Sequence, residues 1–252
     1  MYLSHGTASD PGRRRRENED SFLVDYDPGA YPAQPALFVV CDGVGGAVAG
    51  KTASTLAVDR VCQAFRESRA TDLAARLVDA AEQASAVIFE HSVHHPATEG
   101  MATTLVAAAF DATSCSIVNV GDSRAYRLAG GLLQRLTTDH TLVQEQIASG
   151  MLTAEQAAHS PYRHIITRSL GREPSELGAQ SYPAIPLTPG EVFILCSDGL
   201  TDMVAEGEIR AIAASEEPET AARSLIDRAN AQGGRDNVTV IVIRVEGGES
   251  QG

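Results

Sequence analysis

The stretch Leu37-Phe-Val-Val-Cys-Asp-Gly-Val-Gly-Gly46 joins an apolar run directly to an aspartate and three glycines. The run has the length and β-branched content of a strand, which predicts that Asp42 lies at a strand end. Glycines there let the backbone approach a ligand closely, as a cation or a phosphate requires. A turn would explain one Asp-Gly pair, but Val192-Phe-Ile-Leu-Cys-Ser-Asp-Gly199 repeats the pattern. Two apolar strands that both lead into Asp-Gly therefore need an explanation beyond a single turn.

The composition, 43% hydrophobic and 21% charged over 252 residues, is ordinary for a globular protein. This length allows one large domain with a substantial core. A net charge of −13 argues against nucleic acid or an anionic membrane as a partner, because both demand a basic face. The charge is compatible with a site for divalent cations, although most of the acids are expected to be solvated.

Cys41, Cys62, Cys115 and Cys196 are scattered without any Cys-x-x-Cys pair. Three of them lie in or beside apolar runs, where a thiol behaves as a small buried hydrophobe. Disulfides and a zinc site are therefore not expected, which suits a reducing compartment. No stretch approaches 18 apolar residues, and no signal-peptide core is present. We expect a cytoplasmic protein that acts as a monomer.

The apolar spacing predicts a pair of helices followed by short strands. Residues 50–68 and 71–91 have helical periodicity and a short joint, so they are expected to lie antiparallel over a sheet. Strand-like runs follow at 104–110, 115–120, 124–128 and 132–136. Tight turns leave no room for crossover helices, so these strands are predicted to form an antiparallel meander.

Residues 140–160 are predicted to form two short helices broken at Ser149-Gly150. Together with 161–180 they make a polar insert, a candidate lid of about 140–180 that we call the flap. His140 and His164, both in the flap, have two interpretations: a role on the substrate side, or exposed polar residues, and the second is favoured. Further predicted elements are a strand at 191–197, helices near 205–214 and 218–231, and a strand at 238–245. The order predicts a single layered α+β domain, residues 1–252, with a polar tail at 246–252.

Acidic residues recur at predicted strand ends and in turns. They stand beside Gly, Ser, Asn or Arg, and they are Glu19, Asp20, Asp42, Asp122, Asp198 and Asp236. If these ends converge, they form a carboxylate cage, whose oxygen ligands favour Mg²⁺ or Mn²⁺ over zinc or copper. The acids would repel one another without metal, so metal binding is expected to stabilise the fold.

Two such ions about 3.5–4 Å apart can activate a water molecule and hold phosphoryl oxygens for displacement. An arginine is then needed for the remaining phosphate oxygens, because its planar fork binds them in bidentate fashion. The block Arg13–Arg16, beside Glu19 and Asp20, supplies one. At least two of its four arginines are expected to be simply solvated.

Six short motifs occur in order along the chain. They are Arg15-x-x-Asn18-Glu19-Asp20, Asp42-Gly43-x-Gly45-Gly46, Gly100-Met-Ala-Thr-Thr104, Gly121-Asp122-Ser123-Arg124, Ser197-Asp198-Gly199 and Asp236-Asn237. Over about residues 3–245 the chain resembles the metal-dependent serine/threonine protein phosphatases of type 2C, especially their bacterial single-domain members. The resemblance implies a four-layer α-β-β-α sandwich of two antiparallel sheets flanked by helix pairs. It also implies hydrolysis of phosphoserine and phosphothreonine in proteins, counteracting a cognate serine/threonine kinase.

The resemblance also implies roles at a centre of two Mn²⁺ or Mg²⁺ ions. Asp42 would bridge both ions, and Gly43 would offer its carbonyl to one of them. Asp198 and Asp236 would complete the shell of one ion, and Glu19 would serve the other through water.

Further implied roles lie around this centre. Asp122, with Asp198, would match the weaker third metal site of bacterial members. Arg15 would bind the substrate phosphate, and Asp20 would orient bound waters. The flap would take part in substrate choice.

Two positions depart from the family pattern. Val44 stands where many eukaryotic members carry a histidine proposed as the general acid. Valine cannot transfer a proton, so that role would pass to metal-bound water, to another residue or to none. Lys51 replaces an acidic residue that is common in the family.

Two alternatives remain at this point. Gly45-Gly-Ala-Val-Ala-Gly-Lys-Thr52 matches the P-loop pattern of nucleotide-binding proteins and follows a predicted strand. That fold requires parallel strands, which conflicts with the predicted meander at 104–136. The other alternative is an inactive binding module with the phosphatase fold, but such a module is expected to have lost metal acids, and none is missing.

Overall fold

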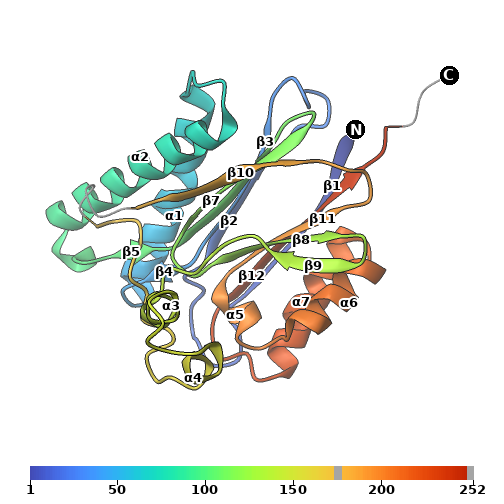
Figure 1. The fold of residues 1–252 in the computed structure, drawn as a ribbon. Coiled ribbons are helices and arrows are strands. Elements are labelled where there is room, and N and C mark those ends of the chain that lie inside the picture. Colours follow the sequence, from blue (N-terminus) through green and yellow to red (C-terminus); the bar gives the residue numbers. More distant parts are fainter. Residues whose placement is uncertain (173–177, 249–252) are drawn as a thin grey trace.

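Two antiparallel five-stranded sheets form the centre of the computed structural model, which describes residues 1–172 and 178–248 (Figure 1). The first sheet contains, in spatial order, β1 (Tyr2–Asp10), β12 (Val238–Glu246), β11 (Val192–Cys196), β8 (Arg124–Ala129) and β9 (Leu132–Arg135). The second contains β10 (Gln180–Pro186), β7 (Ser114–Val120), β6 (Leu105–Phe110), β3 (Ala36–Cys41) and β2 (Ser21–Asp25). A two-stranded ribbon joins β4 (Gly43–Val44) to β5 (Ala102–Thr103).

Helices cover the outer face of each sheet (Figure 1). The second sheet carries α1 (Ala47–Glu67) and α2 (Leu73–His94), and the first carries α5 (Asp198–Thr201), α6 (Glu206–Ser215) and α7 (Pro218–Ala231). A short 3-10 turn, η1 (Pro96–Thr98), follows α2. The predicted four-layer α+β sandwich is thereby confirmed. Among the described residues, no helix is long and apolar enough to cross a membrane.

Three hydrophobic cores separate the four layers, and β3 contributes to two of them. Leu37 and Val39 pack with α1 and α2, whereas Phe38 and Val40 pack between the sheets. Residues on successive positions of a strand point to opposite faces, so a strand that is buried on both sides must be apolar throughout. This explains the uninterrupted apolar run before Asp42. The third core lies between the first sheet and α5, α6 and α7.

The predicted meander at 104–136 is wrong in one respect. The hairpin β6–β7 belongs to the second sheet, whereas the hairpin β8–β9 belongs to the first. The chain crosses between sheets at Gly121-Asp122-Ser123, where Gly121 has φ of +100°, a conformation that glycine adopts without strain. Local spacing specifies each hairpin but cannot say whether consecutive hairpins share a sheet. The crossing places Asp122 between the two sheets.

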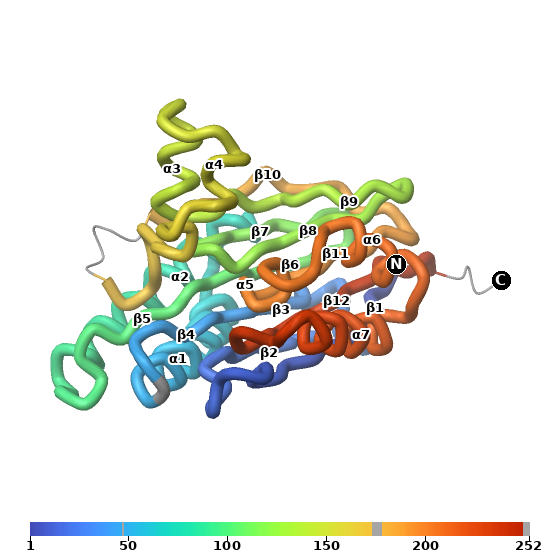
Figure 2. Tube along the Cα trace, turned by 90° about the horizontal axis from the view of Figure 1, so that it is seen from below, coloured from blue at the N-terminus to red at the C-terminus, as the bar shows by residue number. Residues whose placement is uncertain are grey.

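The flap begins with two short helices, as predicted. They are α3 (Leu142–Ala148) and α4 (Ala154–Ala158), and they project together from one side of the sheets (Figure 2). Thr141 and Thr153 cap them by accepting hydrogen bonds from the backbone N–H groups of Gln144 and Gln156. Part of the predicted flap, 173–177, and part of the predicted tail, 249–252, lie outside the described residues. The flap ends at residue 180, where β10 begins.

The N-terminal strand β1 was not predicted, because its sequence Tyr2-Leu-Ser-His-Gly-Thr-Ala-Ser-Asp10 is mostly polar. It lies at the edge of the first sheet and pairs with β12 from Tyr2↔Glu246 to Asp10↔Val238. The pairing brings the segment after β1 beside the turn before β12. Arg13 donates its backbone N–H to the carbonyl of Gly234 at 2.7 Å.

Candidate metal centre

Five of the predicted acids meet in one cavity of about 470 Å³. Asp42 follows β3, Asp198 begins α5 after β11, and Asp122 lies at the crossing between the sheets. The cavity is also lined by Arg15 and Gly43, and its acids are Glu19, Asp42, Asp122, Asp198, Asp202 and Asp236. The predicted convergence of strand ends is therefore present, and both sheets contribute to it. Asp20, in contrast, is not among the residues that line the cavity.

The backbone of Asp42 is fixed by two buried threonines. Its N–H donates to Thr104 Oγ1 at 3.0 Å, and its carbonyl accepts from Thr103 Oγ1 at 2.8 Å and from the Thr104 N–H at 2.9 Å. Thr104 Oγ1 also lies 2.7 Å from Ser123 Oγ, next to Asp122. These bonds hold the backbone and leave the Asp42 carboxylate to the cavity.

The segment that carries Glu19 is tied to the start of α1 and to the segment before β12. The Glu19 N–H donates to Asn237 Oδ1 at 2.9 Å, and Lys51 Nζ donates to the carbonyl of Asp20 at 2.6 Å. A Cβ added to Gly50 would lie 2.0 Å from Glu19 Oε2, so only glycine leaves room for this carboxylate. Gly50 and Lys51 therefore serve to place Glu19 and Asp20.

Asp20 is buried behind the cavity, with 2% of its surface exposed. Its Oδ2 accepts a hydrogen bond from Ser197 Oγ at 2.8 Å, whereas Oδ1 has no partner among the described residues. Burial raises the pKa of the Asp20 carboxyl to about 6 against the opposing effect of its hydrogen bonds. A carboxylate with one free buried oxygen needs a further donor, because unpaired buried polar atoms are costly. The proposed orientation of bound waters would supply one.

Burial and the neighbouring negative charges raise the pKa values of the carboxyl groups in the cavity. Burial, followed by the charges of Asp20, Asp198 and Asp122, raises the pKa of Asp42 well above its ordinary value. Burial and its acidic neighbours do the same for Asp198, and burial raises the pKa of Asp122 to about 6. Such a group binds either protons or cations, because its ionised acids repel one another. Its oxygen donors fit a hard divalent ion such as Mn²⁺ or Mg²⁺.

Arg15 is the predicted arginine that reaches the cavity. Its Nη2 donates to Asp236 Oδ2 at 2.8 Å, and 51% of its side chain is exposed. The hydrogen bond to Asp236 raises the guanidinium pKa, so Arg15 is a permanent cation. Its Nε and Nη1 make no hydrogen bond within the described chain and remain available to an anion.

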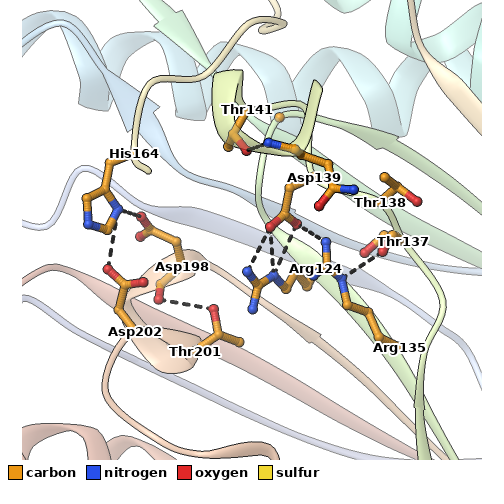
Figure 3. A network of polar contacts seen from close by, with 12 residues as sticks. Arg124, Arg135, Thr137, Thr138, Asp139, Thr141, His164, Asp198, Thr201 and Asp202 are labelled. Atoms are coloured by element: carbon orange, nitrogen blue, oxygen red, sulfur yellow. Dashed lines mark hydrogen bonds and ion pairs between the residues drawn. The ribbon is translucent and has the colours of Figure 1, made fainter. Parts of the chain in front are cut away.

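Two further side chains at the cavity, His164 and Asp202, were not predicted as site residues (Figure 3). His164 Nδ1 lies 3.5 Å from Asp202 Oδ2 and 3.9 Å from Asp198 Oδ2, so the three side chains can share a cation. His164 is exposed, as expected, but it faces the acids. The spacing of Asp198 and Asp202, one helical turn apart, is the signal that could have indicated this pair. Arg163 and Arg235 also line the cavity.

A charged network anchors the start of the flap beside the cavity (Figure 3). Asp139 binds Arg124 at 2.7 Å and Arg135 at 2.5 Å, which joins the flap to β8 and β9. The next residue, His140, was predicted to be exposed but has only 6% of its surface exposed. Its Nδ1 accepts from the N–H of Gly121 at 3.1 Å, and its Nε2 lies 3.1 Å from Gln180 Oε1. The sequence around His140 is polar, and only the tertiary contact with Gly121 explains its burial.

The P-loop alternative conflicts with the fold. β3, which precedes the matching segment, pairs antiparallel with both β2 and β6, whereas that motif belongs to a parallel sheet. In this fold Gly50 leaves room for the Glu19 carboxylate, and Lys51 donates to the carbonyl of Asp20.

Comparison with known proteins agrees with this architecture. The sequence profile of the family described as Protein phosphatase 2C matches residues 13–232. The serine/threonine phosphatase stp of Listeria monocytogenes is 35% identical over 240 residues, which cover 93% of each chain. The crystal structure of the Mycobacterium tuberculosis serine/threonine phosphatase PstP/Ppp superposes with a TM-score of 0.87 at 34% identity. That match covers 98% of this chain and 100% of that one.

A second solved structure is the catalytic domain of the serine/threonine protein phosphatase PstP in complex with two manganese ions. It is 33% identical, with a TM-score of 0.84, and the match covers 98% of this chain and 99% of that one. The family profile spans most of the chain, and the three relatives named above each match almost the whole chain. The chain therefore belongs to the protein phosphatase 2C family and is a serine/threonine protein phosphatase.

Proposed function

We propose that the chain hydrolyses phosphoserine and phosphothreonine in proteins with water activated at a centre of two Mn²⁺ or Mg²⁺ ions. The observation that carries the proposal is the group of acids from both sheets in one cavity with Arg15. The manganese complex of PstP supports the choice of cation. The enzyme would counteract a cognate serine/threonine kinase.

The residues that would hold the ions are those predicted from the sequence. Asp42 would contact both ions, a role supported by its place in the cavity beside the other acids. Gly43 would add its carbonyl. Asp198 and Asp236 would complete one shell, and Glu19 would act through water. A third, weaker site would use Asp122 and Asp198.

When bound there, the cations would activate water for attack on phosphorus and offset the charge of the phosphate. Arg15 would bind the phosphate oxygens with its free N–H groups, which raises the local concentration of substrate and stabilises charge in the transition state. Asp20 would accept hydrogen bonds from waters through its unpaired Oδ1.

The remaining parts of the proposal concern the molecule as a whole. The chain would be a single catalytic domain, residues 1–252, that acts as a cytoplasmic monomer without nucleic acid or membrane as partner. Four free cysteines, three of them buried, support a reducing compartment.

The proposal is tested by hydrolysis of a phosphothreonine peptide with Mn²⁺. EDTA should abolish the activity, and Asp42→Asn should lower kcat by about two to three orders of magnitude, since removing one such electrostatic contact lowers kcat about 10²–10³-fold. Circular dichroism would establish that the variant is folded. Turnover that persists without a divalent ion would overturn the mechanism, and absence of turnover in the unmodified protein would favour the inactive binding module.

A further inference from the structure

Three arginines surround the cavity of an otherwise acidic protein. The chain carries a net charge of −13, yet Arg15, Arg163 and Arg235 all line the cavity and are exposed. They come from the loop after β1, the flap, and the turn before β12. Three separate segments therefore bring a guanidinium group to the same place.

These arginines differ in what they bind. Arg15 is paired with Asp236, whereas Arg163 and Arg235 form no ion pair with any residue of the described chain. Other arginines are paired with carboxylates, as Arg127 is with Glu191 and Arg244 with Glu217. Arg163 and Arg235 thus keep charge available for a ligand beside the cavity.

The loop Arg13–Arg16 extends the basic surface. The bond from Arg13 N to Gly234 O holds this loop against the turn that carries Arg235. Arg13, Arg14 and Arg16 are exposed and form no ion pair with the described part of the chain. We call Arg13–Arg16, Arg163 and Arg235 the basic rim.

Metal binding changes the charge that a substrate meets. Six carboxylates and three arginines line the cavity, so two divalent cations would change its formal charge from −3 to +1. The ions and Arg15 suffice for a dianionic phosphate. Arg163 and Arg235 are then left to face whatever lies beside the phosphorylated residue.

We propose that Arg163 and Arg235 select phosphoserine and phosphothreonine residues that have Asp or Glu beside them in the sequence. The inference rests on the proposed phosphatase activity. An extended peptide advances about 3.3 Å per residue, so side chains one to three positions from the phosphorylated residue lie about 3–10 Å away. Acidic side chains at those positions would pair with the free guanidinium groups of the rim.

The test compares two phosphothreonine peptides of equal length, one with Asp on both sides of the phosphothreonine and one with Asn. Asn has nearly the same shape, so the pair isolates charge. With Mn²⁺ at low ionic strength we expect kcat/KM about fivefold higher for the Asp peptide, the effect of two exposed ion pairs. At 0.5 M NaCl the ratio should fall towards one, because the interaction is screened.

Substitutions of Arg163 and Arg235 test whether these two residues cause the preference for the Asp peptide. Arg163→Gln/Arg235→Gln should bring the ratio of kcat/KM values close to one, and Arg235→Glu should favour the Asn peptide. Arg210→Gln is the matched control, because Arg210 is exposed on α6, donates to the carbonyl of Gly131 and forms no ion pair with the described residues. It should keep the preference unchanged.

The outcomes separate the inference from the function on which it rests. Equal hydrolysis of both peptides by the unmodified enzyme would overturn the inference alone. A preference that survives in the double glutamine variant would overturn the assignment to Arg163 and Arg235. Hydrolysis of neither peptide would overturn the proposed function, and the inference with it.

Discussion

At the scale of single residues, Arg15, the proposed phosphate-binding residue, is paired with Asp236, a proposed metal ligand. Asp236 would bind a metal ion, Arg15 would bind phosphate, and the two side chains bind each other at 2.8 Å. An ion on Asp236 would weaken this pair and leave the guanidinium free for the substrate. The contact holds Arg15 beside the cavity.

Replacement of this arginine gives the first prediction. Arg15→Ala should raise KM for a phosphothreonine peptide about tenfold or more, because it removes a charge-assisted contact with the phosphate. The kcat should fall less than in Asp42→Asn. Steady-state kinetics with saturating Mn²⁺ measure both constants. An unchanged KM together with an unchanged kcat would mean that another arginine binds the phosphate.

His140 is the second residue with a specific expectation. Since Nδ1 accepts from Gly121, the proton of the neutral ring lies on Nε2 and points to Gln180. Burial lowers the pKa of His140 below its ordinary value, with Arg168 acting in the same direction and Asp139 and Glu145 against it. The unfolded chain therefore binds the proton more readily, and this residue's contribution to stability is lost as the pH falls below about 6.5.

His140→Asn isolates this contribution, because the Asn carbonyl can accept from Gly121 without titrating. We expect the free energy of unfolding of the wild type, measured with urea, to fall more between pH 7 and pH 5 than that of the variant. Parallel pH profiles for the two proteins would contradict the assignment of the neutral ring.

At the scale of elements, the first turn of α1 packs against the segment that carries Glu19. Gly50 allows the contact, and Lys51 holds it by donating to the carbonyl of Asp20 and to Ser21 Oγ at 3.0 Å. The segment has no regular structure of its own between β1 and β2. Its position relative to the metal centre therefore depends on α1.

Gly50→Ala should reduce Mn²⁺ affinity at least tenfold, because the new Cβ would overlap Glu19 Oε2 and displace that carboxylate. Isothermal titration with Mn²⁺ measures the effect. Gly207→Ala is the control, since a Cβ there meets nothing within 4 Å. It should leave Mn²⁺ affinity unchanged and stabilise α6 by up to about 1 kcal/mol. Equal Mn²⁺ affinities in the two variants would show that Glu19 is not held by this contact.

The elements that could be predicted from sequence are those with a strong apolar period. The pairs α1–α2 and α6–α7 and the strands β3, β11 and β12 bury their apolar positions, and spacing alone reveals them. β1 and β10 could not be found in this way, because edge strands bury few side chains. The crossing at Gly121 could not be predicted either. The local sequence does not distinguish a β8 that pairs with β7 from a β8 that joins the other sheet.

Apolar patterns also explain which site residues could be predicted from the sequence and which could not. Asp42 and Asp198 could be predicted because each follows a buried strand and precedes glycine. His164, Arg163 and Arg235 lie on polar loops with no period, and only the fold brings them to the cavity.

At the scale of the whole molecule, the proposed metal centre lies where the two sheets meet. Asp42 follows a strand of the second sheet and Asp198 comes after a strand of the first, while Asp122 lies at the crossing. Ionised carboxylates in this place repel one another, which opposes the packing of one sheet on the other. A divalent ion would turn that repulsion into an attraction.

This predicts a pH-dependent effect of Mn²⁺ on thermal stability. The raised pKa values of Asp42 and Asp122 mean that the metal-free folded chain retains protons that the unfolded chain releases. Its stability should therefore decrease as the pH rises from about 4 through 6. Saturating Mn²⁺ should raise Tm by several degrees at pH 7.5 and by less at pH 5, where protons compete. Calorimetry at both values tests this, and an equal shift at the two would contradict it.

The pairing of β1 with β12 has a practical consequence for tethering this enzyme. Tyr2 lies opposite Glu246, whereas Asp10 at the other end of β1 lies near the turn before Asp236. Nine strand residues span about 30 Å. A reporter, tag or scaffold fused to Met1 or beyond Gly248 would therefore leave from the end remote from the proposed metal centre. Immobilised enzyme should consequently remain accessible to large phosphoproteins, whichever terminus is attached.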